Sequence, residues 1–307
     1  MKQDFLATTD FSAKELKEVL TIAKVVKQMH RWGDDPKPLT GKAAALLFRK
    51  PSLRTRASFE MAVRQLGGDT LFFSDAEIGM GKRESIHDVA KVLSRYFDLI
   101  IIRTFEQSEV EQLAEHAEIP VINALTDLLH PCQIMGDIFT IIEQKSRMDN
   151  ITVGYVGDGG SNTSNSWVNL ASRLSLELRI GTISDRKPDE SIMENAENAG
   201  LSKIAITEDP IEAVKDADVI YTDVWASMGE KEMLEEREEK LKPFQVNAEL
   251  LSHAKEDAII MHCLPAERGR EITDEMMDGA QSVVFDQAEN RLHIQKAIIV
   301  HLFGARF

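Results

Sequence analysis

The sequence predicts an α/β protein with two doubly wound parallel-sheet domains, linked by helices and with a ligand site in the cleft between them. Short apolar runs alternate with helical stretches in two successive series. This alternation is typical of parallel sheets that carry helices on both faces. The length of 307 residues fits two domains of about 150 residues each. The composition, 43% hydrophobic and 28% charged, is that of a globular chain.

The chain opens with a well-marked helix. Ser12 can cap its first turn and Glu15 can return a hydrogen bond to the cap, which is the capping-box pattern. Apolar residues then recur at helical spacing, at Leu16, Val19, Leu20 and Ala23. Glycine and proline in residues 33–38 end the pattern.

Short apolar runs predict the buried strands. Those of the first series are residues 43–48, 99–102 and 120–123. Those of the second series are residues 151–156, 178–184, 219–222, 258–262 and 282–285. A polar segment separates the series, so we expect a first domain of residues 1–145, a second of residues 146–287, and a C-terminal helix of residues 288–307 that packs back onto the first. The highly charged residues 230–242 are expected to form an exposed helix or loop.

The chain is acidic, with 36 basic and 51 acidic residues and a formal net charge of −15. This charge repels nucleic acids and anionic membranes, so neither is an expected partner. A small anion remains a reasonable ligand where arginines gather. Two cysteines, Cys132 and Cys263, make no disulfide framework and fit a reducing compartment. No secretory signal and no run long enough to span a bilayer is apparent, so we expect a cytoplasmic protein.

The first candidate site follows the first strand, at Ser52, Arg54, Thr55 and Arg56. A helix that begins here offers free N–H groups and a positive dipole end, which suit a phosphate group. The hydroxyl groups and the planar guanidinium groups would add donors. A simple Ser52 cap beside surface arginines explains this segment equally well by itself.

His130, Pro131 and Gln133 form the second candidate site, at the start of a predicted helix. His130 can donate a hydrogen bond to a carbonyl oxygen, and Gln133 can face the same way. A buried histidine with a structural role is the more ordinary interpretation of this segment alone.

Residues 157–162 read Gly-Asp-Gly-Gly-Ser-Asn directly after a strand. They match a dinucleotide-binding loop in part, with Asp185 placed as the ribose-binding acid, although Asn162 replaces the last glycine. The segment therefore leaves open a non-catalytic nucleotide-binding or amino-acid-binding protein. The glycines can equally serve a tight turn.

Three further segments follow predicted strands or open the last helix. Asp223 can pair with a ligand ammonium group or face water, and Arg291 lies where the last helix begins. Cys263 can act as a nucleophile or a metal ligand. A zinc site would require His130, Cys132, His262 and Cys263 to converge without a Cys-x-x-Cys pattern, so no metal is expected.

Together these segments resemble the aspartate/ornithine carbamoyltransferase family, and its ornithine branch in particular. Residues 52–56 match the family's Ser-Thr-Arg-Thr-Arg motif, and residues 130–133 match His-Pro-x-Gln. Residues 223–229 match Asp-x-x-x-Ser-Met-Gly, and residues 262–265 match His-Cys-Leu-Pro. The last two motifs are the signatures of the ornithine branch. The matches cover essentially the whole chain in the family's order.

The resemblance implies transfer of the carbamoyl group from carbamoyl phosphate to the δ-amine of L-ornithine, giving L-citrulline and phosphate in arginine biosynthesis or degradation. It implies no metal or organic cofactor, and a homotrimer or a multiple of trimers. The alternative within the family is another amine, such as acetylornithine or putrescine.

The resemblance also implies roles for individual residues. Carbamoyl phosphate would be bound by Ser52, Leu53, Arg54, Thr55, Arg103, His130, Gln133, Cys263, Leu264 and Arg291. The catalytic residues would be Arg54, Arg103, His130 and Cys263, with Cys263 positioning the amine rather than attacking. Ornithine would be bound by Asn162, Asp223, Ser227 and Met228.

Three positions depart from the family pattern. Leu53 replaces a common threonine, and Ser161 replaces a common asparagine. Gly79 stands where many relatives have a glutamine that reaches a neighbouring subunit's carbamoyl phosphate.

Overall fold

The computed structural model describes residues 2–81, 83–225 and 234–305. The chain divides into two compact units: unit 1 comprises Met1–Phe139 and Glu289–Phe307, and unit 2 comprises Thr140–Ala288. The chain passes between the units within α6 (Pro131–Lys145) and again within α13 (Val284–Leu302).

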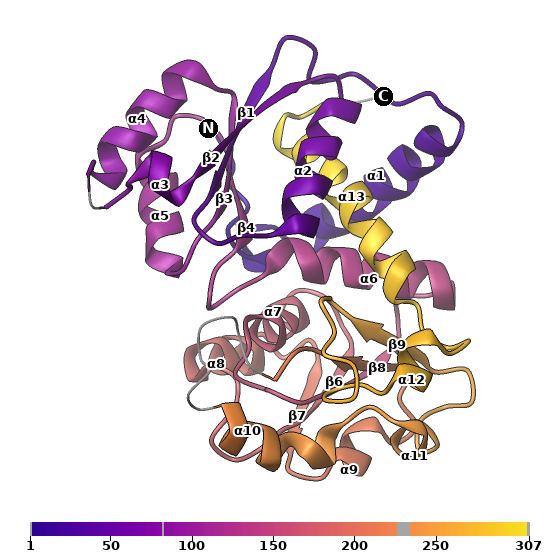
Figure 1. Cartoon of the computed structure of the whole chain (residues 1–307). Helices are drawn as coiled ribbons and strands as arrows, with labels where there is room; N and C mark the ends of the chain where they lie inside the picture. Colours follow the sequence, from indigo (N-terminus) through magenta and orange to yellow (C-terminus); the bar gives the residue numbers. More distant parts are fainter. Residues whose placement is uncertain (1, 82, 226–233, 306–307) are drawn as a thin grey trace. The chain divides into compact units, whose positions relative to one another are not determined.

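Unit 1 is built on a parallel sheet with the strand order β2-β1-β3-β4. Its strands are β1 (Ala43–Phe48), β2 (Asp69–Ser74), β3 (Leu99–Arg103) and β4 (Val121–Leu125). Its other elements are η1 (Thr8–Asp10), α1 (Ala13–Arg31), α2 (Leu53–Gln65), α3 (Asp75–Ile78), α4 (Ile86–Tyr96) and α5 (Gln107–His116). Helices α4 and α5 cover one face of the sheet, and α1, α2 and α13 lie on the other (Figure 1). Since right-handed crossovers run both ways from β1, the helices must occupy both faces.

Unit 2 is built on a second parallel sheet, with the order β7-β6-β5-β8-β9. Its strands are β5 (Thr152–Val156), β6 (Glu177–Gly181), β7 (Lys203–Thr207), β8 (Val219–Thr222) and β9 (Ile259–His262). Its helices are α7 (Asn162–Ala171), α8 (Glu190–Ala199), α9 (Pro210–Val214), α10 (Leu234–Leu241), η3 (Lys242–Phe244), α11 (Ala248–Leu251) and α12 (Asp274–Asp278). Helices α7 and α8 lie on one face and α9 to α11 on the other (Figure 1). The two parallel sheets confirm the predicted fold class.

Each sheet has a point where the strand order reverses. In unit 1 this point lies between β1 and β3, and in unit 2 it lies between β5 and β8. In open α/β sheets, ligands bind outside the carboxyl ends of the strands at such a point. A ligand site is therefore expected at the segments that follow these four strands.

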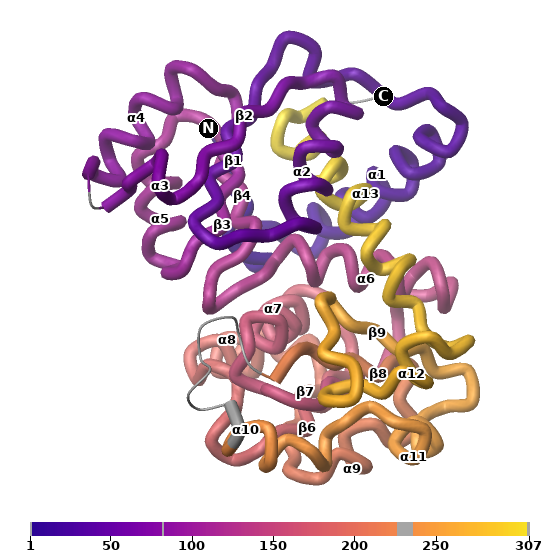
Figure 2. The backbone as a smooth tube through the Cα atoms, viewed as in Figure 1, coloured from indigo at the N-terminus to yellow at the C-terminus, as the bar shows by residue number. Residues whose placement is uncertain are grey.

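The first and last helices lie beside one another in unit 1 (Figure 2). The predicted capping box of α1 is present, because Glu15 accepts a hydrogen bond from the Ser12 N–H at 2.8 Å and donates its own N–H to Ser12 Oγ at 3.3 Å. From α13, Asn290 accepts from buried Lys27 at 2.7 Å, and fully buried Lys296 donates to Asp35 at 2.9 Å. These bonds anchor the end of the chain on unit 1.

One predicted strand is wrong. Residues 282–285 form no strand, because Ser282 makes only an isolated bridge to Ile260 and α13 already begins at Val284. Of the predicted charged segment, residues 234–241 form α10, and residues 230–233 lie outside the described residues. Among the helices of the described ranges, none combines the length and hydropathy needed to cross a bilayer.

Candidate active site

The loop after β1 leads directly into the N-terminus of α2. Ser52 is the N-cap, and its Oγ accepts a hydrogen bond from the Thr55 N–H at 3.2 Å. The other N–H groups of the first helical turn have no acceptor within the helix, which is the arrangement that suits an anion. The Leu53 side chain is 81% exposed, so this residue can offer its backbone N–H without its side chain intervening. Arg54 is half-buried in the same turn.

Thr55 is the point where three distant segments of unit 1 meet. Its Oγ1 accepts a hydrogen bond from Arg103 Nη1 at 3.3 Å and another from Arg291 Nη2 at 2.7 Å. Arg103 ends β3 and Arg291 lies on α13, and both Thr55 and Arg291 are buried. Two guanidinium groups thus converge on one hydroxyl group beside a helix N-terminus, which makes a strongly cationic site in an acidic protein.

His130 lies next to this cationic group. Its side chain is buried, and burial lowers the pKa of the imidazole well below its ordinary value, with Arg291 and Arg103 lowering it further. The ring is therefore neutral at neutral pH. A neutral imidazole donates one N–H, which suits a carbonyl oxygen on which negative charge develops.

Gln133 lies in the first turn of α6 and is fully buried. Its Nε2 donates to Asp137 Oδ1 at 2.8 Å, while its Oε1 has no hydrogen-bond partner within the described residues. A buried acceptor without a partner is costly unless a ligand supplies a donor. An amide N–H₂ group of a ligand would satisfy this oxygen. Asp137 was not predicted, although its spacing of four residues from Gln133 was a signal for this pair.

In unit 2, Asp223 follows β8 and is buried. Its Oδ1 accepts from the Val224 N–H at 2.7 Å and from the Cys263 thiol at 2.9 Å, and its Oδ2 accepts from the Thr163 hydroxyl at 2.8 Å. The Thr163 hydroxyl also lies 3.3 Å from Asn162 Oδ1. Thr163 thus links Asn162 to Asp223, and Asp223 bonds Cys263 directly. The predicted ligands Ser227 and Met228 lie outside the described residues.

The segment that carries Cys263 and Leu264 is held by hydrogen bonds of the buried His262 side chain. His262 Nε2 lies 3.0 Å from Glu271 Oε1, and its Nδ1 accepts from the Leu264 N–H at 2.9 Å. Leu264 adopts a positive φ of 58° and precedes a cis peptide bond to Pro265. Both ring nitrogens are thus engaged. His262, Asp223 and Cys263 offer ligand atoms within 4.8 Å of one another, but His262 would have to give up one of these bonds to bind a metal.

The glycine-rich loop after β5 is filled by the protein itself. Asp158 pairs with Arg186 at 2.6 and 2.8 Å, and its Oδ1 also accepts from the Gly160 N–H at 2.9 Å. A Cβ atom on Gly159 would lie 2.6 Å from the Arg186 carbonyl oxygen. The glycines therefore permit Arg186 to pack closely. The Asp158 carboxylate thus takes up a donor of the loop that a nucleotide phosphate would need, and Asp185 is exposed and pairs with Lys240 at 3.5 Å.

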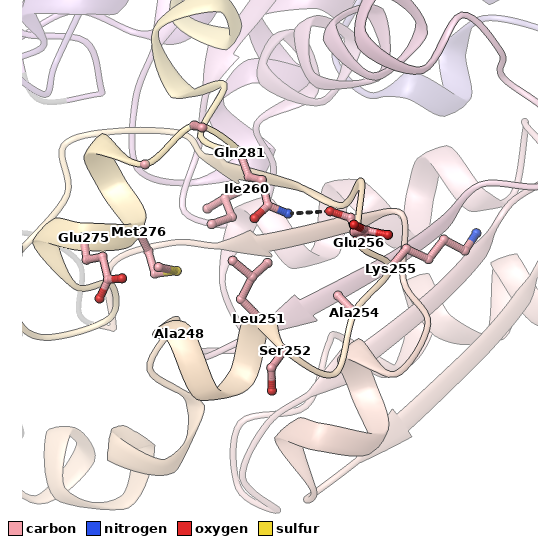
Figure 3. A pocket seen from close by; sticks show the side chains of 12 residues that line it. Ala248, Leu251, Ser252, Ala254, Lys255, Glu256, Ile260, Glu275, Met276 and Gln281 are labelled. Atoms are coloured by element: carbon pink, nitrogen blue, oxygen red, sulfur yellow. Dashed lines mark hydrogen bonds between the residues drawn. The ribbon is translucent and has the colours of Figure 1, made fainter.

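Unit 2 also has an open depression of about 600 Å³, which involves α11, α12 and β9 (Figure 3). Leu251, Ile260 and Met276 form part of its wall, and Gln281 donates to the Glu256 carbonyl oxygen at 3.3 Å (Figure 3). Its lining, taken over the described residues, includes none of the predicted site residues. The candidate site residues lie elsewhere, at or after the carboxyl ends of strands, at helix starts and, for Arg291, within α13.

The two units match two known domains. Residues 3–143 match the carbamoyl-P binding domain of aspartate/ornithine carbamoyltransferase, and residues 149–302 match its Asp/Orn binding domain. The fold and the site thus define a two-domain carbamoyltransferase. The chain belongs to the aspartate/ornithine carbamoyltransferase family.

Similar proteins cover the full length of the chain. The ornithine carbamoyltransferase of Syntrophus aciditrophicus (strain SB) is 48% identical over 299 residues, 97% of this chain and 99% of that protein. The anabolic ornithine carbamoyltransferase of Pyrococcus furiosus is 45% identical over 305 residues, 98% of this chain and 96% of that protein. The solved structure of the ornithine carbamoyltransferase from Pyrococcus furiosus has a TM-score of 0.94 and 43% identity, covering 100% of this chain and 98% of that one.

Proposed function

We propose that this protein is an ornithine carbamoyltransferase, which transfers the carbamoyl group of carbamoyl phosphate to the δ-amine of L-ornithine and yields L-citrulline and phosphate. The observation that carries this proposal is the convergence of Arg103 and Arg291 on Thr55, with neutral His130 beside them. Such a site fits a small, doubly negative ligand that also has a carbonyl group.

Carbamoyl phosphate would be bound in unit 1. The first turn of α2, with Ser52, Leu53, Arg54 and Thr55, would bind the phosphate through N–H groups, hydroxyl groups and a guanidinium group. Arg103, His130 and Thr55 would donate to the carbonyl oxygen. Gln133 Oε1 would accept from the carbamoyl N–H₂ group, which Leu264 and Arg291 would help to orient. Each donor aimed at the developing oxyanion contributes about 3–4 kcal/mol in comparable sites.

Ornithine would be bound in unit 2. Asp223 and Ser227 would receive the α-ammonium group, and Asn162 with the Met228 backbone would receive the α-carboxylate. The δ-amine must be neutral when it attacks, because an ammonium group has no lone pair. Its nitrogen forms a bond to the carbonyl carbon, the bond between that carbon and the phosphate oxygen breaks, and the amine proton leaves with the phosphate. The Cys263 thiol donates to Asp223, and its proposed role is to position the amine without forming a covalent bond.

The test is citrulline formation from carbamoyl phosphate and ornithine by the wild-type protein and two variants. Arg291→Gln removes a cation from the site, and we expect kcat/KM to fall by about a hundredfold or more. Arg64→Gln is the matched control. Arg64 is exposed and lies in the last turn of α2, at the opposite end of this helix from Thr55. Absence of citrulline with the wild-type protein, or equal activity of the two variants, would contradict the proposal.

The choice of amine is tested by comparing ornithine with acetylornithine and putrescine. Buried Asp223 is an anion suited to a free α-ammonium group, whereas an acylated nitrogen needs no anion. We therefore expect ornithine to give the highest kcat/KM of the three. A higher kcat/KM for acetylornithine or putrescine would identify that amine as the substrate instead.

We further propose assembly into trimers or multiples of trimers in a reducing, cytoplasmic environment. The family resemblance supports the assembly, and two cysteines that form no disulfide, Cys132 and Cys263, support the reducing environment. Large apolar side chains on unit 1, Trp32, Leu53 and Tyr96, are 74%, 81% and 72% exposed and offer surface that assembly would cover. Sedimentation velocity would measure the mass, and a monomer at micromolar concentration would contradict the proposal.

A further inference from the structure

Thr163 links two residues of the candidate ornithine site, and neither the motifs nor the family pattern assigns it a role. It lies in the first turn of α7, directly after Asn162, and is 1% exposed. Its Oγ1 donates to Asp223 Oδ2 at 2.8 Å, and Asn162 Oδ1 lies 3.3 Å away. The hydroxyl has one proton, so the shorter bond to the carboxylate is the principal one.

The Asp223 carboxylate has limited capacity left for a ligand. A carboxylate offers about four acceptor sites, two on each oxygen. Oδ1 uses its two sites for the Val224 N–H and the Cys263 thiol, and Oδ2 uses one for Thr163. Counted over the described residues, one site remains on Oδ2, and Thr163 determines its direction by holding that oxygen. The carboxylate is thus oriented before a ligand arrives.

We propose that Thr163 is a positioning residue that orients Asp223 Oδ2 toward the α-ammonium group of the amino acid. The identity of that amino acid rests on the proposed function. Valine has nearly the shape of threonine, so replacing Thr163 by valine keeps the packing and removes only the hydroxyl group. A hydrogen bond to a charged group is stronger than a neutral one, and losing it releases the carboxylate from its fixed orientation.

The test compares two ligands that differ at the α-carbon. Norvaline has the α-ammonium group and lacks the δ-amine, whereas 5-aminopentanoate has the δ-amine and lacks the α-ammonium group. Calorimetric dissociation constants are measured for both in the presence of saturating carbamoyl phosphate. In Thr163→Val, we expect norvaline to bind about tenfold more weakly and 5-aminopentanoate to bind as in the wild-type protein. Thr163→Ser keeps the hydroxyl and should restore norvaline binding to within about twofold.

The matched control is Thr182→Val. Thr182 is another buried threonine of unit 2, and its hydroxyl bonds to the Gly159 N–H and the Arg186 carbonyl oxygen rather than to Asp223. This variant should leave the ratio of the two dissociation constants unchanged. In turnover, Thr163→Val should raise KM for ornithine by about tenfold and change kcat less.

Several outcomes would overturn the inference. If Thr163→Val weakens the binding of both ligands equally, Thr163 has only a structural role. If norvaline binds unchanged, the Thr163 hydroxyl does not influence ligand binding. Failure of Thr163→Ser to restore binding would have the same consequence. Citrulline formation by the wild-type protein tests the proposed function separately. If norvaline binding depends on Thr163 but the wild-type protein forms no citrulline, the proposed function is contradicted and this inference stands.

Discussion

The hydroxyl group of Thr55 receives hydrogen bonds from two guanidinium groups, which places like charges close together in a buried site. Like charges repel one another more strongly where little water screens them. A doubly negative ligand would offset this repulsion. Affinity for carbamoyl phosphate is therefore expected to depend on how well Thr55 holds the two arginines.

This gives the first prediction. In Thr55→Val the hydroxyl acceptor is lost, and Arg103 and Arg291 lose their shared anchor. We expect kcat/KM for carbamoyl phosphate to fall by about a hundredfold, as for other preorganised donors of an oxyanion site. Thr55→Ser keeps the hydroxyl and should remain within about tenfold of the wild-type value. Steady-state kinetics measure both, and equal effects of the two substitutions would refute the role of the hydroxyl.

The second prediction concerns His130. Burial and two neighbouring guanidinium groups hold the pKa of its imidazole well below the value near 6.5 that an unfolded chain has. Below about pH 6.5, the unfolded state therefore binds more protons than the folded state, and stability falls as the pH falls. This residue contributes a slope of up to about 1.4 kcal/mol per pH unit in that window.

The measurement is urea unfolding of the ligand-free protein at about pH 7.5 and about pH 5.5. The wild-type protein should lose more stability on acidification than His130→Asn, which has no imidazole to protonate. An identical loss in the two proteins would contradict the assignment of His130 as a buried neutral base.

At the scale of the elements, the fully buried strands could be predicted, including β4 and β9 at sheet edges, whereas the exposed edge strands β2 and β7 could not. β1 and β3 read as continuous apolar runs because both faces are covered. β2 and β7 are edge strands with alternating exposed and half-buried residues, such as Asp69 and Lys203 at their starts, and they carry no such signal. The wrongly predicted strand at residues 282–285 is the opposite case, because the short apolar run of residues 283–285 does not distinguish a strand from the start of a helix.

The candidate site shows the same division at the level of side chains. Arg103, His130 and Asp223 stand at strand ends or helix starts, where the α/β fold concentrates ligands, so their positions could be predicted. Thr163 could not be, because a threonine beside Asn162 has no distinctive pattern. Its role depends on the distance to Asp223, 60 residues later in the chain, which only the folded structure reveals.

The glycine-rich loop after β5 gives the third prediction. A Cβ atom at residue 159 would lie 2.6 Å from the backbone carbonyl oxygen of Arg186, which cannot easily move away. We expect Gly159→Ala to lower the free energy of unfolding by about 1–3 kcal/mol through overpacking. Gly136→Ala in α6 is the control, because its Cβ would make only ordinary contacts and alanine favours a helix. Chemical denaturation measures both, and an equally stable Gly159→Ala would show that the close packing is not required.

For the whole molecule, the formal charge of −15 and the cationic site of unit 1 act in opposite directions on ligands. The overall field repels large polyanions, whereas Arg103 and Arg291 attract a small anion at short range. An acidic molecule thus carries a local cationic site whose charge suits one small dianion.

The fourth prediction is a pattern of thermal stabilisation. Carbamoyl phosphate with norvaline should raise the unfolding temperature, by an amount that corresponds to about 2.7 kcal/mol at a hundredfold excess over the dissociation constant. NAD at the same concentration should produce no shift, because Asp158 and Arg186 already fill the glycine-rich loop. A shift with NAD and none with carbamoyl phosphate would favour a nucleotide-binding protein.

The Asp158–Arg186 pair has a broader consequence. The strand-turn-helix unit after β5 has the shape that many proteins use to capture adenylate cofactors, yet here a tethered carboxylate competes for the same donors at very high effective concentration. A free nucleotide would have to displace the Asp158 carboxylate, which is covalently part of the loop. The Asp158 carboxylate is therefore expected to keep ATP and NAD out of this loop even where they are abundant.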